Sequence, residues 1–487
     1  MISLRVRSCG ASPGSRSSAR RPGSRSTVLV RLSLAALVGG TLLVPRAHTQ
    51  APSRLAWLDP YREAATRLIQ ESTSDDFAWR RLAELTDTYG HRFSGSESLN
   101  LAIAWAVDTM KRDGLEDVRT EPVMVPRWVR GRESAELVVP PGQSLAILGL
   151  GGSIGTPAAG IEAEVLVVNS FEDLRKRAAD AKGRIVLFNA PFTTYPDTIT
   201  YRTGGARAAS QHGALAALVR GVGPVGLRTP HTGSVEYGQS ITPIPAASVA
   251  AEDADRIARL RARGVPVRVR LTMGARSEED VESANVVGEI RGRELPREIV
   301  LLGGHIDSWD VGTGASDDAV GCIVTWEAAR LMLKLGLRPR RTVRIVLWTN
   351  EENGLRGAAA YAARHAAHAA DHVFALESDS GVFEPASIGF TGSIAARTLA
   401  RDIGTLLAPL GLTEVVGGGG GADIGPIAQA GNAPMMAYLG NPARYFTIHH
   451  TSADTVERIA PGEVSRAAAA IAVIAYVVAE MPERLPK

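Results

Sequence analysis

The sequence predicts an α/β fold in which a mostly parallel central sheet carries helices on both faces. Short, continuous apolar runs have the pattern of strands buried on both sides, and they lie at 299–302, 341–348, 372–377 and 434–439. Helical patterns fall between and after these runs, at about 320–335 and 461–480. Strands that alternate with helices in this way favour a parallel sheet, because each parallel strand needs a long crossover connection.

The first 50 residues differ in composition from the rest of the chain. They are rich in arginine and serine, and an apolar run from Leu32 to Val44 precedes Pro-Arg-Ala-His-Thr-Gln, a candidate processing site. A membrane anchor is the alternative, but a span needs about 20 apolar residues and this run is shorter. We therefore predict that residues 1–50 are a signal peptide, that the protein is exported (secreted or periplasmic), and that the mature chain is not inserted in a membrane.

The charge of the chain is unevenly distributed. The whole chain carries +3, and the eight arginines of residues 1–50, where acids are absent, leave −5 for the remainder. An acidic mature chain does not favour nucleic acid as a partner. Of the two cysteines, Cys9 lies in the predicted leader and Cys322 remains alone, so we expect no internal disulfide.

The residues after the leader are enough for two or three domains. Residues 51–124 carry two or three helical patterns, including 76–89 and 96–113. The loop Gly-His-Arg-Phe-Ser-Gly-Ser separates these two at 90–96, and its composition indicates no function. We predict that this stretch is the first part of the main domain, which resumes at 281–487.

Between these two parts, residues 125–280 have a different character. Short apolar runs alternate there with glycine and proline, and we expect a strand at 184–189 and a helix that starts at 204–212. His, Asp and Glu form no compact set in this stretch. We therefore predict an inserted, β-rich accessory domain that shapes access to a site elsewhere.

The stretch from Gly303 to Gly321 is the centre of the predicted site. His305 stands at the carboxyl end of the first apolar strand, which is where open α/β sheets place their sites. Asp307 points to the same side of an extended backbone and is close enough to orient the imidazole. Asp317 and Asp318 follow in a loop of small residues. Because carboxylates clustered beside a histidine are costly without a cation, we predict a metal site with His305 and one of these two aspartates as ligands.

Two later strand ends and one loop deliver further metal-competent side chains. Glu351 and Glu352 follow the second strand, and neighbours on an extended backbone point to opposite sides, so one carboxylate can bind metal while the other acts as a general base. Asp379 follows the third strand, and His449 and His450 lie in the loop after the fourth. Each of these alone is also explained by a charged turn or a cap. Their recurrence at successive strand ends favours one common site.

The candidate ligands are two histidines, two aspartates and a glutamate, without cysteine. Imidazole suits zinc, and a carboxylate can bridge two cations. This set exceeds what one tetrahedral catalytic ion needs and leaves a base over, which favours two metal ions roughly 3.5 to 4 Å apart. Such a pair polarises a carbonyl and lowers the pKa of bound water, and that is the chemistry of hydrolysis.

These residues resemble, in order and context, the M28 family of zinc peptidases. The match includes Ser-Asp-Asp-Ala around Asp317, the pair Glu351-Glu352 and His-Thr-Ser-Ala-Asp-Thr from His450. Three further segments are most similar to the carboxypeptidase Q branch of the family, namely 304–312, 90–96 and 422–426. The resemblance covers essentially the whole mature chain. It implies a zinc exopeptidase fold, a short-peptide substrate and a homodimer, with residues 125–280 as a protease-associated (PA) domain inserted in the catalytic domain.

The resemblance also implies a role for each candidate. His305 and Asp379 would bind one zinc, Glu352 and His450 the other, and Asp317 would bridge them. Glu351 would be the general base and acid. Neighbouring polar residues would support these ligands: Asp307, Asp318, His449 and Asp454. One departure is Ala319, which stands where the family usually has glycine after the two aspartates; a tight backbone there would make the site less tolerant.

Alternatives remain open at the level of the sequence. An inactive relative that uses the fold as a binding or receptor module would be expected to have lost ligands or base, whereas this chain keeps them. A one-zinc cyclase or aminoacyl transferase is disfavoured by the complete second ligand set. Aminopeptidase, carboxypeptidase and dipeptidase activity all fit the same hydrolytic centre. For the donor to the oxyanion the sequence offers Tyr438 and Tyr445 without a choice between them.

Overall fold

The structure is a computed structural model that describes residues 54–412 and 414–487. The predicted signal peptide at 1–50 lies outside the described residues. The described chain forms one compact unit from Arg54 to Lys487, which contains two eight-stranded sheets.

Three helices precede the first strand, after a short turn η1 (Ala56–Leu58), and they confirm the helical patterns expected there. Their bounds are α1 Asp59–Ser72, α2 Phe77–Tyr89 and α3 Glu97–Arg112. The hydroxyl of Ser96 caps α3 by accepting from the backbone N–H of Leu99. The cap fixes where the loop at 90–96 ends, and this loop reaches the candidate site described below.

The first sheet has the strand order β1-β10-β12-β11-β13-β16-β14-β15. The bounds are β1 Glu116–Val129, β10 Arg276–Ile290, β12 Arg341–Trp348, β11 Leu295–His305, β13 His372–Glu377, β16 Met435–Leu439, β14 Ser387–Thr391 and β15 Val415–Gly417. The four central strands β12, β11, β13 and β16 are parallel to one another, as predicted. β1 pairs antiparallel with β10, β10 with β12, and β14 with β16, whereas β15 is parallel to β14, so the sheet as a whole is mixed. The parallel centre aligns the carboxyl ends of three site-bearing strands.

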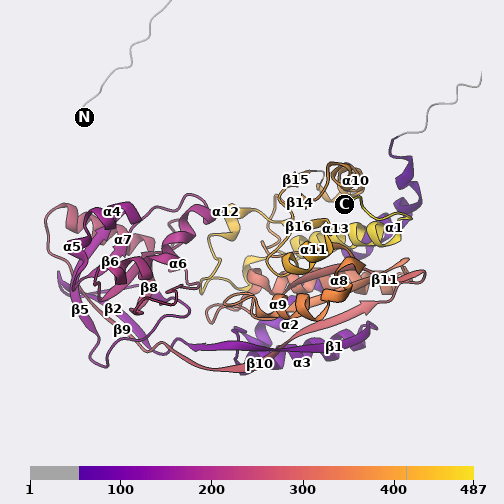
Figure 1. Cartoon of the computed structure of the whole chain (residues 1–487). Coiled ribbons are helices and arrows are strands. Elements are labelled where there is room, and N and C mark those ends of the chain that lie inside the picture. The colour runs from indigo at the N-terminus through magenta and orange to yellow at the C-terminus, as the bar shows by residue number, and fades with distance from the viewer. Residues whose placement is uncertain (1–53, 413) are drawn as a thin grey trace, which may run out of the picture. The chain divides into compact units, whose positions relative to one another are not determined.

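Helices cover both faces of the first sheet (Figure 1). One face packs against α1, α2, α3, α8 (Val320–Lys334) and α13 (Pro461–Glu480) in the largest apolar core. The other face packs against α9 (Arg356–Arg364) and α11 (Gly425–Gly431). Shorter elements complete this part: η2 Ala315–Ala319, η3 Ala366–Asp371, α10 Ile394–Gly404, η4 Thr405–Leu410, α12 Pro442–Tyr445 and η5 Val456–Arg458.

Helix α13 is long and apolar enough to cross a membrane by length and composition. Its most apolar 18-residue window is 83% buried inside the structure, and the helix packs against α8 and α1. The apolar composition of α13 is therefore explained by its position in the core.

The second sheet lies in the chain between β1 and β10 and has the order β3-β2-β9-β5-β6-β7-β8-β4. Its strands are β2 Glu133–Val139, β3 Gln143–Leu145, β4 Ile147–Gly149, β5 Ile161–Val168, β6 Ile185–Phe188, β7 Ala216–Arg220, β8 Ala246–Val249 and β9 Arg268–Met273. Four helices accompany them: α4 Phe171–Lys176, α5 Ala178–Ala181, α6 Tyr195–Gln211 and α7 Ala251–Ala262. We call residues 130–275, between the long strands β1 and β10 of the first sheet, the insert (Figure 1).

The insert differs in two ways from its sequence-based description. It contains helices as well as strands, so β-rich describes only part of it. The prediction of a helix start at 204–212 is wrong, because α6 begins at Tyr195, where Thr194 caps it by accepting from the N–H of Asp197. Gly204 and Gly205 lie inside the helix, and a Cβ on Gly205 would stand 3.1 Å from the ring of Phe188. Gly205 therefore permits close packing of α6 on β6.

Candidate metal centre

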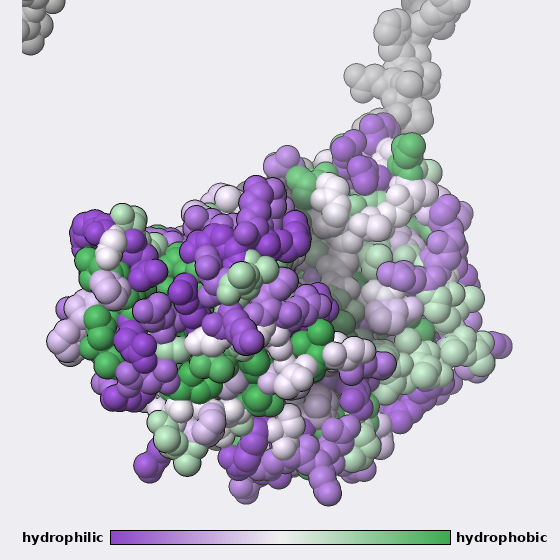
Figure 2. Space-filling view, turned by 60° about the vertical axis from the view of Figure 1, so that its left-hand side comes forward, coloured by the Kyte–Doolittle hydropathy of each residue, from purple (hydrophilic) through white to green (hydrophobic). Residues whose placement is uncertain are grey.

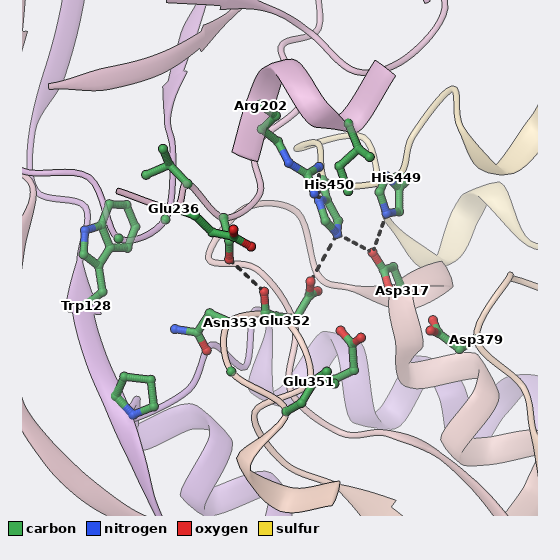
Figure 3. A pocket seen from close by; sticks show the side chains of 18 of the residues that line it. Trp128, Arg202, Glu236, Asp317, Glu351, Glu352, Asn353, Asp379, His449 and His450 are labelled. Carbon is green, nitrogen blue, oxygen red and sulfur yellow. Dashed lines mark hydrogen bonds and ion pairs between the residues drawn. The ribbon is translucent and has the colours of Figure 1, made fainter. Parts of the chain in front are cut away.

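The predicted ligands converge at the carboxyl edge of the first sheet. His305 is the last residue of β11, Glu352 follows β12, and Asp379 follows β13. Asp317 comes from η2, just before α8, and His450 from the loop after α12. Apart from the deeper His305, these side chains line a cavity of about 960 Å³ that also receives residues of the insert, and Figure 3 shows their carboxylates and rings directed toward one another.

The face drawn in Figure 2 is mostly hydrophilic, with apolar residues scattered over it.

Asp317 lies in the middle of the candidate ligands and presents one oxygen to each side. Its Oδ1 is 3.2 Å from Nε2 of His305, which is also 3.4 Å from Oδ1 of Asp379. Its Oδ2 is 3.1 Å from Nε2 of His450, which is also 3.1 Å from Oε2 of Glu352. We call His305 and Asp379 the His305 group, and His450 and Glu352 the His450 group. The two groups share Asp317, which is the arrangement that a bridging carboxylate requires.

The donor atoms at the centre have the properties of metal ligands. Nε2 of His305 and Oδ2 of Asp317 are buried without a hydrogen-bond partner among the described residues. Burial alone lowers the pKa of His305, but the facing carboxylates of Asp317 and Asp379 raise it well above its usual value. Burial, with the charge of Asp317, raises the pKa of Glu352 to about 7. Clustered buried carboxylates are costly unless a cation neutralises them, and imidazole nitrogens are metal ligands as well. The five candidate residues therefore fit divalent metal ions.

Glu351 stands beside the ligands without joining either group. Its Oε2 is 4.0 Å from Nε2 of His305, and its carboxylate faces the cavity (Figure 3). Burial raises the pKa of Glu351 well above its ordinary value, and the neighbouring acids Asp379 and Glu352 add to the shift. A carboxyl group with a raised pKa at the mouth of a metal site has the position and basicity of a general base.

The ring of His305 is oriented by a backbone carbonyl. Its Nδ1 is 2.9 Å from the main-chain oxygen of Asp307, whereas the carboxylate of Asp307 is 3.9 Å away. The expectation that this carboxylate orients the imidazole therefore needs correction, because the chain turns after β11 and brings the carbonyl to the ring. The carboxylate instead accepts from the backbone N–H groups of Glu351 at 3.1 Å and Glu352 at 3.4 Å. Asp307 thus joins the end of β11 to the end of β12.

Other predicted neighbours hold the loop of Asp317. Asp454 accepts from the backbone N–H groups of Ser316 at 2.7 Å and Asp317 at 3.1 Å. Asp318 accepts from the backbone N–H of His305 at 3.1 Å. At Ala319 the backbone has φ −55°, which alanine adopts as readily as glycine, so the departure from the family pattern brings no strain at this position.

His449 and His450 both lie close to Asp317. Their rings stack at 3.6 Å between centroids, and Nε2 of His449 is 3.5 Å from Oδ2 of Asp317. His450 is nearer to Asp317 and also contacts Glu352, so the geometry favours His450 as the ligand. His449 then forms part of the cavity wall next to Tyr195 and Phe446.

The two candidate oxyanion donors occupy different environments. Tyr445 lines the cavity, and burial together with the charges of Asp317 and Asp379 raises its pKa well above the usual value. Tyr438 lies in the core of the first sheet, where burial, with a smaller contribution from the charge of Glu384, raises its pKa. The structure therefore brings Tyr445, and not Tyr438, to the candidate centre as a protonated donor.

Two arginines near the site carried no functional signal in the sequence. Arg92, in the loop at 90–96, is fully buried and donates to the carbonyls of Ile306, Thr313 and Gly314, which frame the segment between β11 and η2. Arg202, in α6 of the insert, is 4% exposed and reaches within 3.3 Å of Nδ1 of His450. Contacts of this kind go mainly to backbone atoms, so no motif of side chains announces them.

Comparison with known proteins gives one consistent answer. Residues 285–475 match the model of peptidase family M28. The chain is 43% identical to human carboxypeptidase Q over 91% of this chain and 93% of that protein. A solved peptidase M28 precursor from Shewanella amazonensis superimposes with a TM-score of 0.84 at 33% identity, covering 88% of this chain and 99% of the other. A zinc aminopeptidase from Bacillus subtilis shares the fold, with a TM-score of 0.63 at 19% identity over 84% of this chain and 96% of the other.

The matched segment spans β10 to α13, and it contains every candidate ligand and the candidate base. The similarity to carboxypeptidase Q extends beyond this segment, because its coverage includes the insert. Ligand geometry and sequence similarity thus agree on the same edge of the same sheet. The chain belongs to peptidase family M28 and is a metallopeptidase.

Proposed function

We propose that the protein is an exported two-zinc exopeptidase that hydrolyses dipeptides or other short peptides. The observation that carries this proposal is the position of Asp317, whose two oxygens face two separate ligand groups at 3.2 and 3.1 Å. One cation would be held by the His305 group and the other by the His450 group, with Asp317 between them. A one-zinc cyclase on the same fold would use only one of the two ligand groups to bind metal.

The residues around this pair divide the chemistry among themselves. Zinc at the two positions would polarise the scissile carbonyl and lower the pKa of a water molecule. Glu351 accepts the proton of that water and returns it to the leaving amine. The Tyr445 hydroxyl, kept protonated by its raised pKa, donates to the carbonyl oxygen as negative charge develops there. Glu351 thus transfers the proton to the leaving amine, and Tyr445 stabilises the negative charge on the carbonyl oxygen.

Glu351→Gln tests this division of labour. The variant keeps the shape of the side chain and removes the base, so turnover should fall by roughly 10² to 10⁴-fold while metal content is unchanged. Metal analysis of the purified variant, together with its rate on a dipeptide, checks both parts. Full activity in Glu351→Gln would exclude Glu351 as the base.

We further propose that the enzyme reads the carboxyl end of its substrate. The guanidinium of Arg202 borders the cavity and has no acidic partner among the ion pairs of the described residues; it contacts Thr232, Tyr195 and His450. A buried positive charge without a counter-ion is costly, and a terminal carboxylate supplies one. The similarity to carboxypeptidase Q supports the same choice.

Peptides with free and amidated carboxyl ends separate the possible specificities. The mature chain should cleave free-acid dipeptides and tetrapeptides, lose this activity with a chelator and regain it with zinc. Arg202→Met should raise KM for free-acid peptides at least tenfold more than KM for amidated peptides, because loss of its contacts with Thr232 and His450 affects both substrates alike. Equal effects on both substrates would remove Arg202 from recognition, and release of the amino-terminal residue would identify an aminopeptidase.

Export, the PA-domain assignment of the insert and assembly belong to the same proposal. The composition of residues 1–50 supports export, and the proposed partners are short peptides and a second copy of the chain, without nucleic acid or stable membrane insertion after leader removal. Cell fractionation with amino-terminal sequencing of the mature enzyme tests export. Light scattering of the mature enzyme tests the homodimer, which a monomeric mass at micromolar concentration would exclude.

A further inference from the structure

The two ligand histidines are held in the same way by different parts of the chain. Nδ1 of His305 meets the carbonyl of Asp307, two residues along the same segment. Nδ1 of His450 meets the carbonyl of Thr232, 3.2 Å away and 218 residues earlier, in the insert. We propose that residues 231–234 of the insert, which we call the docking segment, are positioning residues for the His450 group, so that one of the two cation subsites forms only when the insert is docked. This inference rests on the two-cation proposal above.

The docking segment contacts the His450 group from several directions. The N–H of Thr232 donates to the carbonyl of His450 at 2.9 Å, and Nδ1 of His231 donates to the carbonyl of His449 at 2.8 Å. The hydroxyl of Ser234 donates to the carbonyl of Glu352 at 3.1 Å. Both members of the His450 group are thus tied to the insert through their own backbones.

The contact with Thr232 bears on which nitrogen of His450 carries the proton. The carbonyl of Thr232 accepts at 3.2 Å from Nδ1, whereas Nη1 of Arg202, 3.3 Å from the same Nδ1, can only donate. With the proton on Nδ1, His450 donates to Thr232 and its Nε2 keeps a lone pair for the centre. His450 has φ +59°, in the left-handed region that a residue with a side chain rarely adopts. Two hydrogen bonds to one residue, Thr232, through the carbonyl and the ring of His450, hold this conformation in place.

The docking segment is itself fixed inside the insert. Arg202 donates to the carbonyl of Thr232 at 3.2 Å, and the hydroxyl of Thr232 donates to the carbonyl of Gly149 at 2.8 Å. Gly233 has φ +133°, and a Cβ at this position would lie 2.3 Å from Cζ of Arg202. The segment therefore needs glycine at 233 both for its conformation and for the approach of the guanidinium.

The His305 group has no corresponding dependence. Its histidine is held by Asp307 and Asp318, and Asp379 follows β13 directly. Among the described residues, the hydrogen bonds and ion pairs of His305 and Asp379 involve residues outside the insert. Disturbance of the docking segment should consequently weaken one cation subsite and spare the other.

The test is a titration of the metal-free, full mature enzyme with Co²⁺ and Zn²⁺, followed by calorimetry and by the visible spectrum of Co²⁺. Gly233→Ala and Ser234→Ala are the test variants. Gly238→Ala and Ser240→Ala are the matched controls, because Gly238 also has positive φ (+75°) with only Arg207 at 4.0 Å from a Cβ, and Ser240 is exposed. Thermal unfolding of the metal-free variants verifies that each is folded.

The wild type should bind two cations. In Gly233→Ala one of the two should bind roughly 10 to 100-fold more weakly, as expected when a ligand loses its supporting contacts, while the other changes less than twofold. Ser234→Ala should show the same pattern with a smaller change, and both controls should match the wild type. If Gly233→Ala fails to fold, Ser234→Ala decides alone.

Two reference backgrounds identify the affected subsite. In Asp379→Asn, where the His450 group holds the remaining cation, adding Gly233→Ala should weaken its binding by the same roughly 10 to 100-fold. In His450→Gln, where the His305 group holds the remaining cation, adding Gly233→Ala should change its affinity less than twofold. Equal weakening in both backgrounds, or none in either, overturns the role of the docking segment while the two-cation centre stands. A single cation in the wild type overturns the two-cation centre and the docking role together.

Discussion

The His305 group and the His450 group give the candidate centre two halves of different origin. The His305 group stands on adjacent parallel strands, β11 and β13, and its histidine is oriented from two residues away. The His450 group stands on loops after β12 and α12, and its histidine is oriented from the insert. One half is therefore fixed by the sheet that forms the core, and the other by the docking of a second sheet. Inserts in such enzymes can thus complete a site as well as restrict access to it.

Asp317 is where the two halves meet, and its substitution should have the largest effect. Asp317→Asn keeps the volume but removes the negative charge shared by both groups, so both cations should bind more weakly. Turnover should fall by more than the roughly 10² to 10⁴-fold expected for the base variant. Metal content and rate measure this, with Asp379→Asn as the comparison that should affect one cation. Loss of a single cation in Asp317→Asn would show that the carboxylate does not bridge.

Trp309, in the segment after β11, packs against both the insert and His450, and Trp309→Ala should have the next largest effect. Its ring stacks on Phe93 at 4.9 Å, lies edge-on to His450 at 5.7 Å, and packs so closely on the insert that a Cβ on Gly151 would be 2.2 Å from it. Loss of a buried tryptophan costs about 3–5 kcal/mol of unfolding free energy.

Trp309→Ala should also weaken cation binding selectively at the His450 group, which its ring contacts. A second tryptophan provides the control. Trp326 is fully buried among α2, α3 and α8 and contacts Trp105. Trp326→Ala should cost a similar free energy of unfolding without separating the two cation affinities. Chemical denaturation and the Co²⁺ titration measure the two quantities. Identical metal binding in both variants would show that Trp309 contributes packing alone.

Removing the cations should make stability depend on pH with a defined sign. Burial and neighbouring acids raise the pKa values of Glu352 and Glu377 from an ordinary 4.5 to about 7. These groups bind more protons in the folded than in the unfolded state between those values, so the stability of metal-free protein should fall as pH rises from about 4.5 to about 7.

Added zinc should remove this loss of stability at neutral pH, because the cations replace the protons. Thermal unfolding of metal-free and zinc-loaded protein across this pH range checks the sign. Glu352→Gln removes a titrating carboxyl group of the His450 group, and Glu377→Gln removes one near the His305 group. Each variant should reduce the dependence of metal-free stability on pH. A metal-free profile that rises with pH would contradict the assignment of these buried acids.

Much of the His305 half could be predicted from the sequence, because it depends on patterns within short segments of the chain. β12, β13 and α13 have the predicted bounds, because continuous apolar runs and a long apolar helix leave few alternatives. Acids and a histidine placed directly after such strands must meet at one edge of a parallel sheet. Three of the candidate ligands, His305, Glu352 and Asp379, could therefore be predicted from strand ends alone.

The support of the His450 half could not be found in the same way. The contacts between Thr232 and His450 join residues 218 apart in the sequence. They use only backbone atoms of Thr232, so they require no particular side chain there. The start of α6 was also mispredicted, because the helix begins at Tyr195 and residues 204–211 lie inside it. Gly233 was the available sequence signal for this contact. A glycine is needed there because the guanidinium of Arg202 packs against it, and only the fold brings the two residues together.

The smallest expected effect concerns the loop at 90–96, which bears on the His305 half. The Ser94 hydroxyl donates to the carboxylate of Asp307 at 3.3 Å and accepts from Nδ2 of Asn350 at 3.0 Å. Ser94→Ala removes both contacts and should cost about 1 kcal/mol of unfolding free energy. Both cations should still bind with affinities within twofold of the wild type, because the carbonyl of Asp307 continues to orient His305. A selective loss of the cation at the His305 group would instead show that this half, too, depends on support from outside its own strands.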